Sequence, residues 1–82
     1  MQAMKRYRLT AVIWKEGSQY VSKCPELGVA SYGNTPEHAK AALEEAIALY
    51  ISNAKKLGLI QDIKSTLSSE QRYTTPIEIA MA

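Results

Sequence analysis

A turn followed by a long amphipathic helix, over residues 33–58, is the feature that most constrains how this chain can fold. Thr35 is placed to cap the helix, and Pro36 to occupy its first position, where a missing N–H costs no hydrogen bond. Two lysines fall in the last turn, and Gly58 follows where helices commonly end in a left-handed residue. Between these signals one apolar stripe recurs at helical spacing, made of Ala39, Leu43, Ala46, Tyr50, Ala54 and Leu57.

Three strands are predicted before this helix. Residues 6–16 alternate between two faces and are rich in β-branched and aromatic side chains, which is typical of a strand. A turn at Gly17 leads into a second strand over residues 19–23, so the two strands form a hairpin. The corner at residues 24–28 contains a proline that cannot continue the ladder, and a short third strand follows over residues 29–32. An antiparallel meander is therefore expected.

The segments on either side of the helix complete the predicted architecture. Gly33, before the helix, is expected to supply the unusual backbone angles of the turn. After the helix, apolar residues at helical spacing predict a short second helix over residues 59–67. An alternating run at residues 77–81 is expected to close the sheet as a last strand. The predicted fold class is α+β, with an antiparallel sheet of three to four strands packed against one main helix.

The length and charge of the chain restrict its organisation and its partners. A chain of 82 residues is expected to form one domain, with a loose leader at residues 1–4, a main unit at 5–58 and a completing segment at 59–82. Association with another chain would add to the stability of so modest a core. A net charge of +2 is too small to indicate nucleic acid or an anionic membrane as the partner. The single cysteine and the lack of a long apolar run or signal-peptide pattern favour a cytoplasmic location.

Several local motifs, taken in order, resemble those of the HicB-like family of small proteins. These motifs are Lys15-Glu16-Gly17, Tyr20-Val21, the corner Cys24-Pro25-Glu26-Leu27, Gly28-Val29, Gly33-Asn34-Thr35 and the helix rich in Ala, Leu and Glu. The family includes the antitoxins of HicA–HicB toxin–antitoxin systems and stand-alone members of unassigned role. Many relatives carry an additional proline before the glycine of the corner, whereas in this chain Leu27 precedes Gly28 directly.

The resemblance implies a degraded ribonuclease-H-like sheet with a helix packed on it, and a protein partner rather than a substrate. The partner would be a small RNA-cleaving toxin of the HicA type, whose active surface the domain covers. HicB antitoxins that repress their own promoters usually carry a DNA-binding segment after this domain. Residues 59–82 are too short for a full helix-turn-helix, so DNA binding is not expected.

We therefore expect a non-catalytic interaction domain of the antitoxin type, with two alternatives. One is a stand-alone oligomeric domain of regulatory or unknown role, and the other is a hydrolase that uses Cys24 and His38. A buried cysteine and a surface histidine are the structural explanation of the same two residues. Residues 6–15 contain no acid to begin a ribonuclease-H-type metal site, and no cofactor is expected.

Candidate contact residues follow from charge and from apolar character. A basic partner would be attracted by carboxylates near the family motifs, namely Glu26, Glu37, Glu44 and Glu45. Trp14 is an apolar anchor if the helix covers the opposite face of the first strand, and a core residue if the faces are reversed. A dimer or larger oligomer is expected from the wide apolar band on the helix, which includes Ile47, Leu49 and Ile51.

Overall fold

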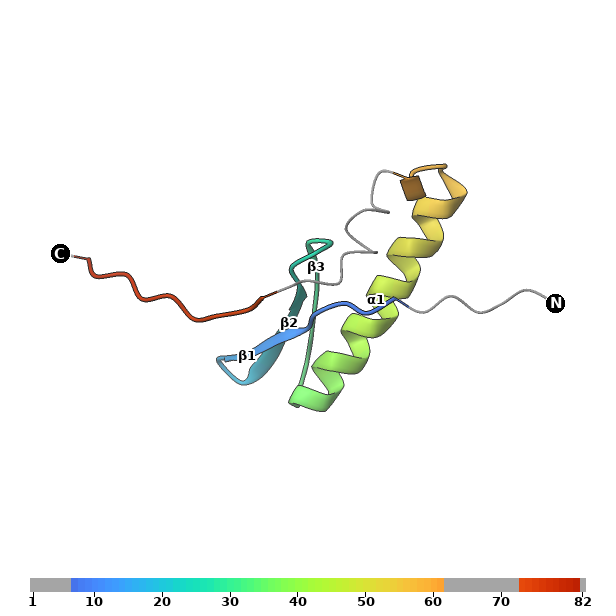
Figure 1. The fold of residues 1–82 in the computed structure, drawn as a ribbon. Helices are drawn as coiled ribbons and strands as arrows, with labels where there is room; N and C mark the ends of the chain where they lie inside the picture. Colours follow the sequence, from blue (N-terminus) through green and yellow to red (C-terminus); the bar gives the residue numbers. More distant parts are fainter. Residues whose placement is uncertain (1–6, 62–72, 82) are drawn as a thin grey trace.

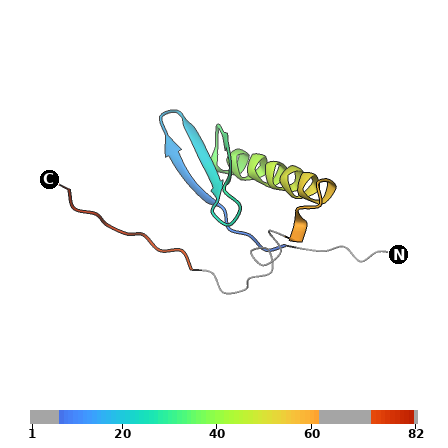
Figure 2. The same ribbon diagram turned by 90° about the horizontal axis from the view of Figure 1, so that it is seen from above.

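A computed structural model describes residues 7–61 and 73–81 of the chain, and it consists of a small sheet and one long helix (Figure 1). The elements are β1 (Val12–Glu16), β2 (Gln19–Cys24), β3 (Val29–Gly33) and α1 (Pro36–Lys56). The strands pair antiparallel in the order β1-β2-β3, and α1 lies against one face of this sheet (Figures 1 and 2). The α+β class and the three-stranded meander are confirmed.

Two glycine-containing turns set the register of the sheet. Between β1 and β2 the turn contains Gly17, whose φ of 64° suits a residue without a side chain. Between β2 and β3 the turn ends at Gly28, which has a φ of 72° and donates its backbone N–H to the carbonyl of Cys24 at 2.9 Å. Both turns lie where the sequence predicts them. They bring each strand directly beside the one before it.

The first strand is shorter than predicted, because β2, the strand that it pairs with, ends. Val12 pairs with Lys23, so residues before Val12 would have to pair with Cys24 and the corner that follows it. The chain turns there, and Pro25 has no N–H to donate. Residues 7–11 consequently belong to no strand, and the predicted strand over residues 6–16 is wrong in its first half.

Both ends of α1 are built as the sequence predicts. The hydroxyl of Thr35 accepts a hydrogen bond from the backbone N–H of His38 at 3.0 Å, which is an N-cap. At the other end, Gly58 has a φ of 72° and donates to the carbonyl of Lys55, while Leu59 donates to that of Ala54. These two bonds form a Schellman motif, which satisfies carbonyls that the helix leaves unpaired.

Gly33 is required for a different reason from the one predicted. Its φ is not positive, so no unusual backbone angle is involved. A Cβ atom at this position would lie 2.6 Å from the backbone nitrogen of Ala39 and 2.7 Å from the carbonyl carbon of His38. Gly33 therefore allows the end of β3 to approach the first turns of α1 closely.

The core between sheet and helix is small and centred on Leu43. Among the described residues, the buried apolar side chains are Cys24, Ala39, Leu43 and Ala54. Ser22 of the central strand is also fully buried, and its hydroxyl donates to the backbone carbonyl of Ala39 at 2.8 Å. This bond joins the middle strand directly to the helix backbone.

The helix is longer than the sheet that it covers. A helix of 21 residues extends about 30 Å, whereas strands of five or six residues extend about 17–20 Å. The later turns of α1 therefore project past the sheet (Figure 1). Tyr50 and Leu57, which the sequence places on the apolar stripe, are exposed, whereas Ala54 between them is buried.

Beyond α1, the predictions have different outcomes. A new helical turn begins at residues 60–61, and the rest of the predicted second helix lies outside the described residues, as does the predicted loose leader. The predicted last strand is wrong in this structure, because residues 77–81 pair with no described strand. Ile77, Ile79 and Met81 are instead 81%, 70% and 88% exposed.

Candidate functional site

The face of the sheet opposite α1 carries a row of apolar side chains across all three strands. Trp14 of β1 pairs with Val21 of β2, and Val21 pairs with Tyr32 of β3. Directly paired residues place their side chains on the same face. The next residues along the strands, which include Ser22, point to the helix, so this row points away from it. We call Trp14, Val21 and Tyr32 the sheet-face row.

The sheet-face row is accessible and extends into a second row. Trp14 is 40% exposed and Tyr32 is 65% exposed. On the neighbouring register positions Val12 pairs with Lys23, and Lys23 pairs with Ala30. The face thus combines apolar area, an indole and a phenol that each carry a hydrogen-bond donor, and one cation. Trp and Tyr are enriched among the residues that contribute most to binding at protein interfaces.

Two members of the sheet-face row, Val21 and Tyr32, are not among the candidate contact residues predicted from the sequence. The positions of the two turns nevertheless determine where these residues lie. The pairing of Glu16 with Gln19 around the first turn places Val21 opposite Trp14, and the pairing of Cys24 with Val29 then places Tyr32 opposite Val21. For Trp14, the structure selects the outward orientation over the core alternative, because α1 lies on the other face.

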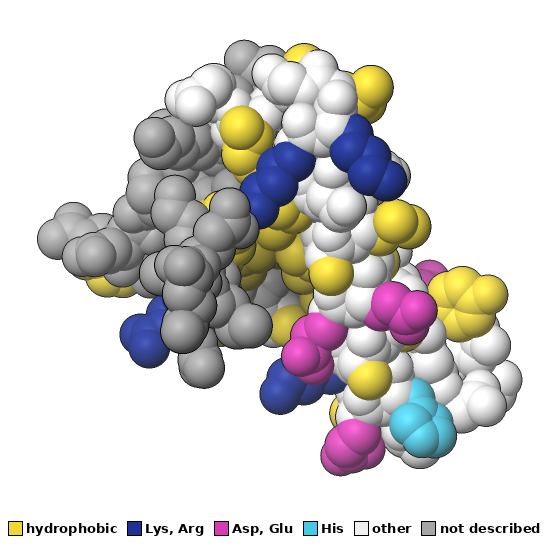
Figure 3. Space-filling model, turned by 90° about the vertical axis from the view of Figure 1, so that its right-hand side faces the viewer, with side chains coloured by type: hydrophobic (Ala, Val, Ile, Leu, Met, Phe, Trp, Pro, Cys, Tyr) yellow, Lys and Arg dark blue, Asp and Glu magenta, His cyan; other side chains and the backbone are white. Residues whose placement is uncertain are grey.

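The helix carboxylates do not join Trp14 on one surface. Glu37, Glu44 and Glu45 are exposed on α1, which packs on the opposite side of the sheet. The same helix carries Lys40, Lys55 and Lys56, so it has no net acidic charge. Figure 3 looks onto this side of the molecule and shows acidic and basic side chains together along the helix. A single surface that combines these acids with Trp14 is therefore not formed.

Glu26 is a structural residue of the corner. Its carboxylate accepts hydrogen bonds from the backbone N–H of Thr10 at 3.1 Å, from the Thr10 hydroxyl at 2.6 Å and from the Cys24 thiol at 3.3 Å. Partial burial pushes the pKa of Glu26 upward, but the hydrogen bonds from Thr10 outweigh it and hold this pKa below its ordinary value of 4.5. The carboxylate fastens the chain ahead of β1 to the end of β2.

Acid is expected to weaken this attachment. A carboxylate whose pKa is lowered by folding stabilises the native state above its unfolded pKa, and this contribution is lost as the pH falls through the folded pKa. Between neutral pH and a pH well below 4.5, the parent should therefore lose more unfolding free energy than Glu26→Gln. Urea unfolding at both pH values measures the difference. Equal losses in the two proteins would show that Glu26 contributes nothing through its charge.

Cys24 and His38 do not form a catalytic pair in this structure. Cys24 pairs with Val29 at the start of β3, whereas His38 lies beside Gly33 at its end, about 13 Å further along the strand. Burial raises the pKa of the Cys24 thiol above its ordinary value of 9.0, and the hydrogen bond to Glu26 raises it further. A thiol in this state is a poor nucleophile. The geometry supports the structural explanation of both residues.

Two other kinds of site are absent from the described part of the chain. Within residues 7–61 and 73–81, no three His, Cys, Asp or Glu side chains gather as ligands for a metal ion. Across the same residues, no helix combines the length and the apolar character that crossing a membrane requires.

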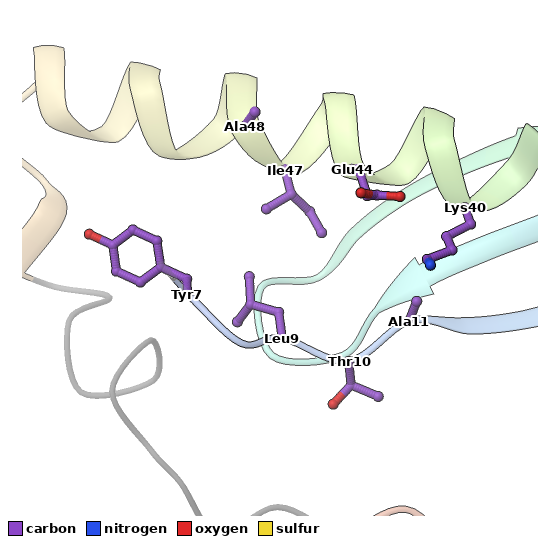
Figure 4. Close-up of a pocket in the computed structure, with 8 residues that line it drawn as sticks. All are labelled: Tyr7, Leu9, Thr10, Ala11, Lys40, Glu44, Ile47 and Ala48. Atoms are coloured by element: carbon purple, nitrogen blue, oxygen red, sulfur yellow. The ribbon is translucent and has the colours of Figure 1, made fainter. Parts of the chain in front are cut away.

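The three apolar residues predicted to form an oligomer interface point in different directions. Leu49 is 63% exposed, but residues two positions apart on a helix lie about 200° around its axis from one another. Ile47 and Ile51 are half-buried on the other flank of α1. There, Ile47 faces Leu9 across an open groove of about 360 Å³, which Figure 4 shows.

This groove lies between the flank of α1 and the chain ahead of β1. Its lining is mostly apolar and consists of Tyr7, Leu9, Thr10, Ala11, Lys40, Glu44, Ile47 and Ala48. Leu9 and Ile47 point toward each other in Figure 4, whereas Thr10 points away from the helix. Among residues 7–61 and 73–81, no other element covers this β1 side of the sheet and helix.

Comparison of the chain with models of protein families, with curated proteins and with solved structures returned no match.

Proposed function

We propose that this chain is a protein-interaction domain that binds a protein partner through the sheet-face row. The observation that carries the proposal is the exposure of Trp14 and Tyr32, with the half-buried Val21 between them, on a face that α1 leaves uncovered. An uncovered strand surface of this kind gains stability when a partner removes its aromatic side chains from water.

A protein suits this surface better than a nucleic acid does. Proteins that bind single strands combine stacked aromatic residues with several basic side chains that follow the phosphates. Here Lys23 is the one basic residue in the sheet-face row and the row beside it, and its neighbours Val12 and Ala30 are apolar. The aromatic residues are separated by Val21 rather than by a cation.

The resemblance of the local motifs to HicB-like proteins suggests which partner this is. Three antiparallel strands followed by a helix is the order that a reduced ribonuclease-H-like fold has, which supports the same assignment. We therefore propose an antitoxin-type role, in which the domain binds a small RNA-cleaving toxin of the HicA type and blocks it. The stand-alone oligomeric alternative keeps the same surface for a different protein.

The test is to measure binding of the purified chain to a HicA-like protein encoded beside it, and inhibition of that protein's RNA cleavage. Trp14→Ala and Tyr32→Ala should each weaken binding by about 30-fold, because truncation of an interface aromatic costs about 2 kcal/mol. Inhibition of RNA cleavage should fall in parallel.

The matched control lies on the other side of the molecule. Glu44→Lys combined with Glu45→Lys reverses two exposed charges on α1 and should leave binding unchanged. Loss of binding in this control, with Trp14→Ala unaffected, would move the interface to the helix. If the chain binds single-stranded oligonucleotides and no toxin-like protein, the proposed function is wrong.

A further inference from the structure

Among the described residues, β1 pairs only with β2, so within this part of the chain the outer edge of β1 has no partner strand. Such an edge is a template for another strand unless something blocks it. The chain's own residues 73–76 run beside residues 10–13, but an open space of about 700 Å³ lies between the two segments.

The segment that follows has the pattern of a strand without a sheet. Residues 77–81 alternate, so in an extended chain Ile77, Ile79 and Met81 share one side and Glu78 and Ala80 the other. All five residues are exposed, and the segment runs away from the sheet and helix in both ribbon views (Figures 1 and 2). Exposed strand-like segments of this apolar character are normally paired in a native protein.

The open edge and the unpaired segment fit each other chemically. The apolar groove of Figure 4 and the space beside residues 73–76 both border Thr10 and Ala11. A strand laid along this edge would direct alternate side chains toward the flank of α1, where Leu9 and Ile47 line the groove. Its remaining side chains would face outward, which suits the charge of Glu78.

We propose that residues 77–81 are a donor strand that pairs with the β1 edge of a second copy of this chain. Because every copy holds both the donor strand and the open edge, the exchange is reciprocal and closes into a two-fold dimer. Each donor strand inserts its apolar side into the groove between Leu9 and Ile47 of the other copy. The dimer needs no other partner. Edge pairing also leaves the sheet-face row uncovered.

Sedimentation velocity on the full chain tests the exchange directly. The parent should be a dimer at micromolar concentration. Ile77→Ser combined with Ile79→Ser should raise the dimer dissociation constant at least about tenfold. The matched control, Glu78→Gln, alters the outward side of the same segment and should leave the dissociation constant unchanged. Both positions of the double variant are highly exposed within one copy, so circular dichroism should show an unchanged fold.

Cross-linking then distinguishes exchange from closure within one chain. A copy with Ala11→Cys, mixed with a differently sized copy with Ile79→Cys, should give a heterodimer with a short thiol-specific reagent. A parent that is monomeric at all concentrations would overturn the proposal. So would a dimer unaffected by the double serine variant, or a monomer cross-linked internally when both cysteines are in one chain. Trp14→Ala should not change the dimer, so this outcome is independent of toxin binding.

Discussion

Leu43→Ala is expected to lower the free energy of unfolding by about 3 kcal/mol. Leu43 is 1% exposed and is the largest of the fully buried side chains. The other buried apolar residues among those described are Cys24, Ala39 and Ala54, which are all smaller than leucine. A domain of 82 residues has a total stability of about 4–12 kcal/mol, of which this loss is a large share.

Urea unfolding followed by circular dichroism measures this effect, and Leu49→Ala is its matched control. Leu49 lies on the same helix but is 63% exposed, so its truncation should cost less than about 0.5 kcal/mol. Equal losses at Leu43 and Leu49 would mean that α1 does not pack on the sheet through the face described above.

Gly33→Ala should be the second most damaging substitution, with a cost of about 2 kcal/mol or more. The added Cβ would meet backbone atoms of Ala39 and His38 at 2.6 and 2.7 Å, and backbone cannot move aside as a flexible side chain can. Either β3 or the first turns of α1 would have to shift. The free energy of unfolding, again from urea titration, gives the cost.

Gly28 provides the comparison, because it needs glycine for its backbone angle and not for space. Its φ is 72°, and a Cβ there would meet nothing within 4 Å. Asparagine tolerates this conformation better than alanine, so Gly28→Asn should be less destabilising than Gly28→Ala. At Gly33 the order should be reversed, since asparagine is larger. The same order at both positions would contradict the steric explanation of Gly33.

Local signals in the sequence were sufficient for the helix and for the turns. The cap at Thr35, the Schellman motif at Gly58 and the glycine turns each depend on residues close together in the chain. Such features can be predicted because the same few residues both encode and form them. The register across the sheet, and with it the sheet-face row, follows from the turns once they are located.

The predictions that are wrong concern relations between distant parts of the chain. The alternation of the first strand continues back to residue 6, but alternation does not say where the partner strand ends. Likewise, the pattern of residues 77–81 is that of a strand, but an alternating pattern does not say which strand edge the segment pairs with. The proposed acidic and aromatic surface failed because α1 and Trp14 lie on opposite faces, which depends on the side of the sheet that the helix covers.

The hydrogen bond from Ser22 to the carbonyl of Ala39 has a consequence for how this domain can change over time. The side chains of an alanine-rich helix face interdigitate little with a sheet, so such a helix can shift or rotate on it. One buried hydrogen bond fixes the helix in a single position and orientation. Ser22 and Leu43 fix the position of α1 on the inner face of the sheet. The side chains on the opposite face therefore have no part in holding the helix. Trp14, Val21 and Tyr32 can therefore be exchanged for other side chains while the scaffold stays the same, which allows one architecture to acquire new partners.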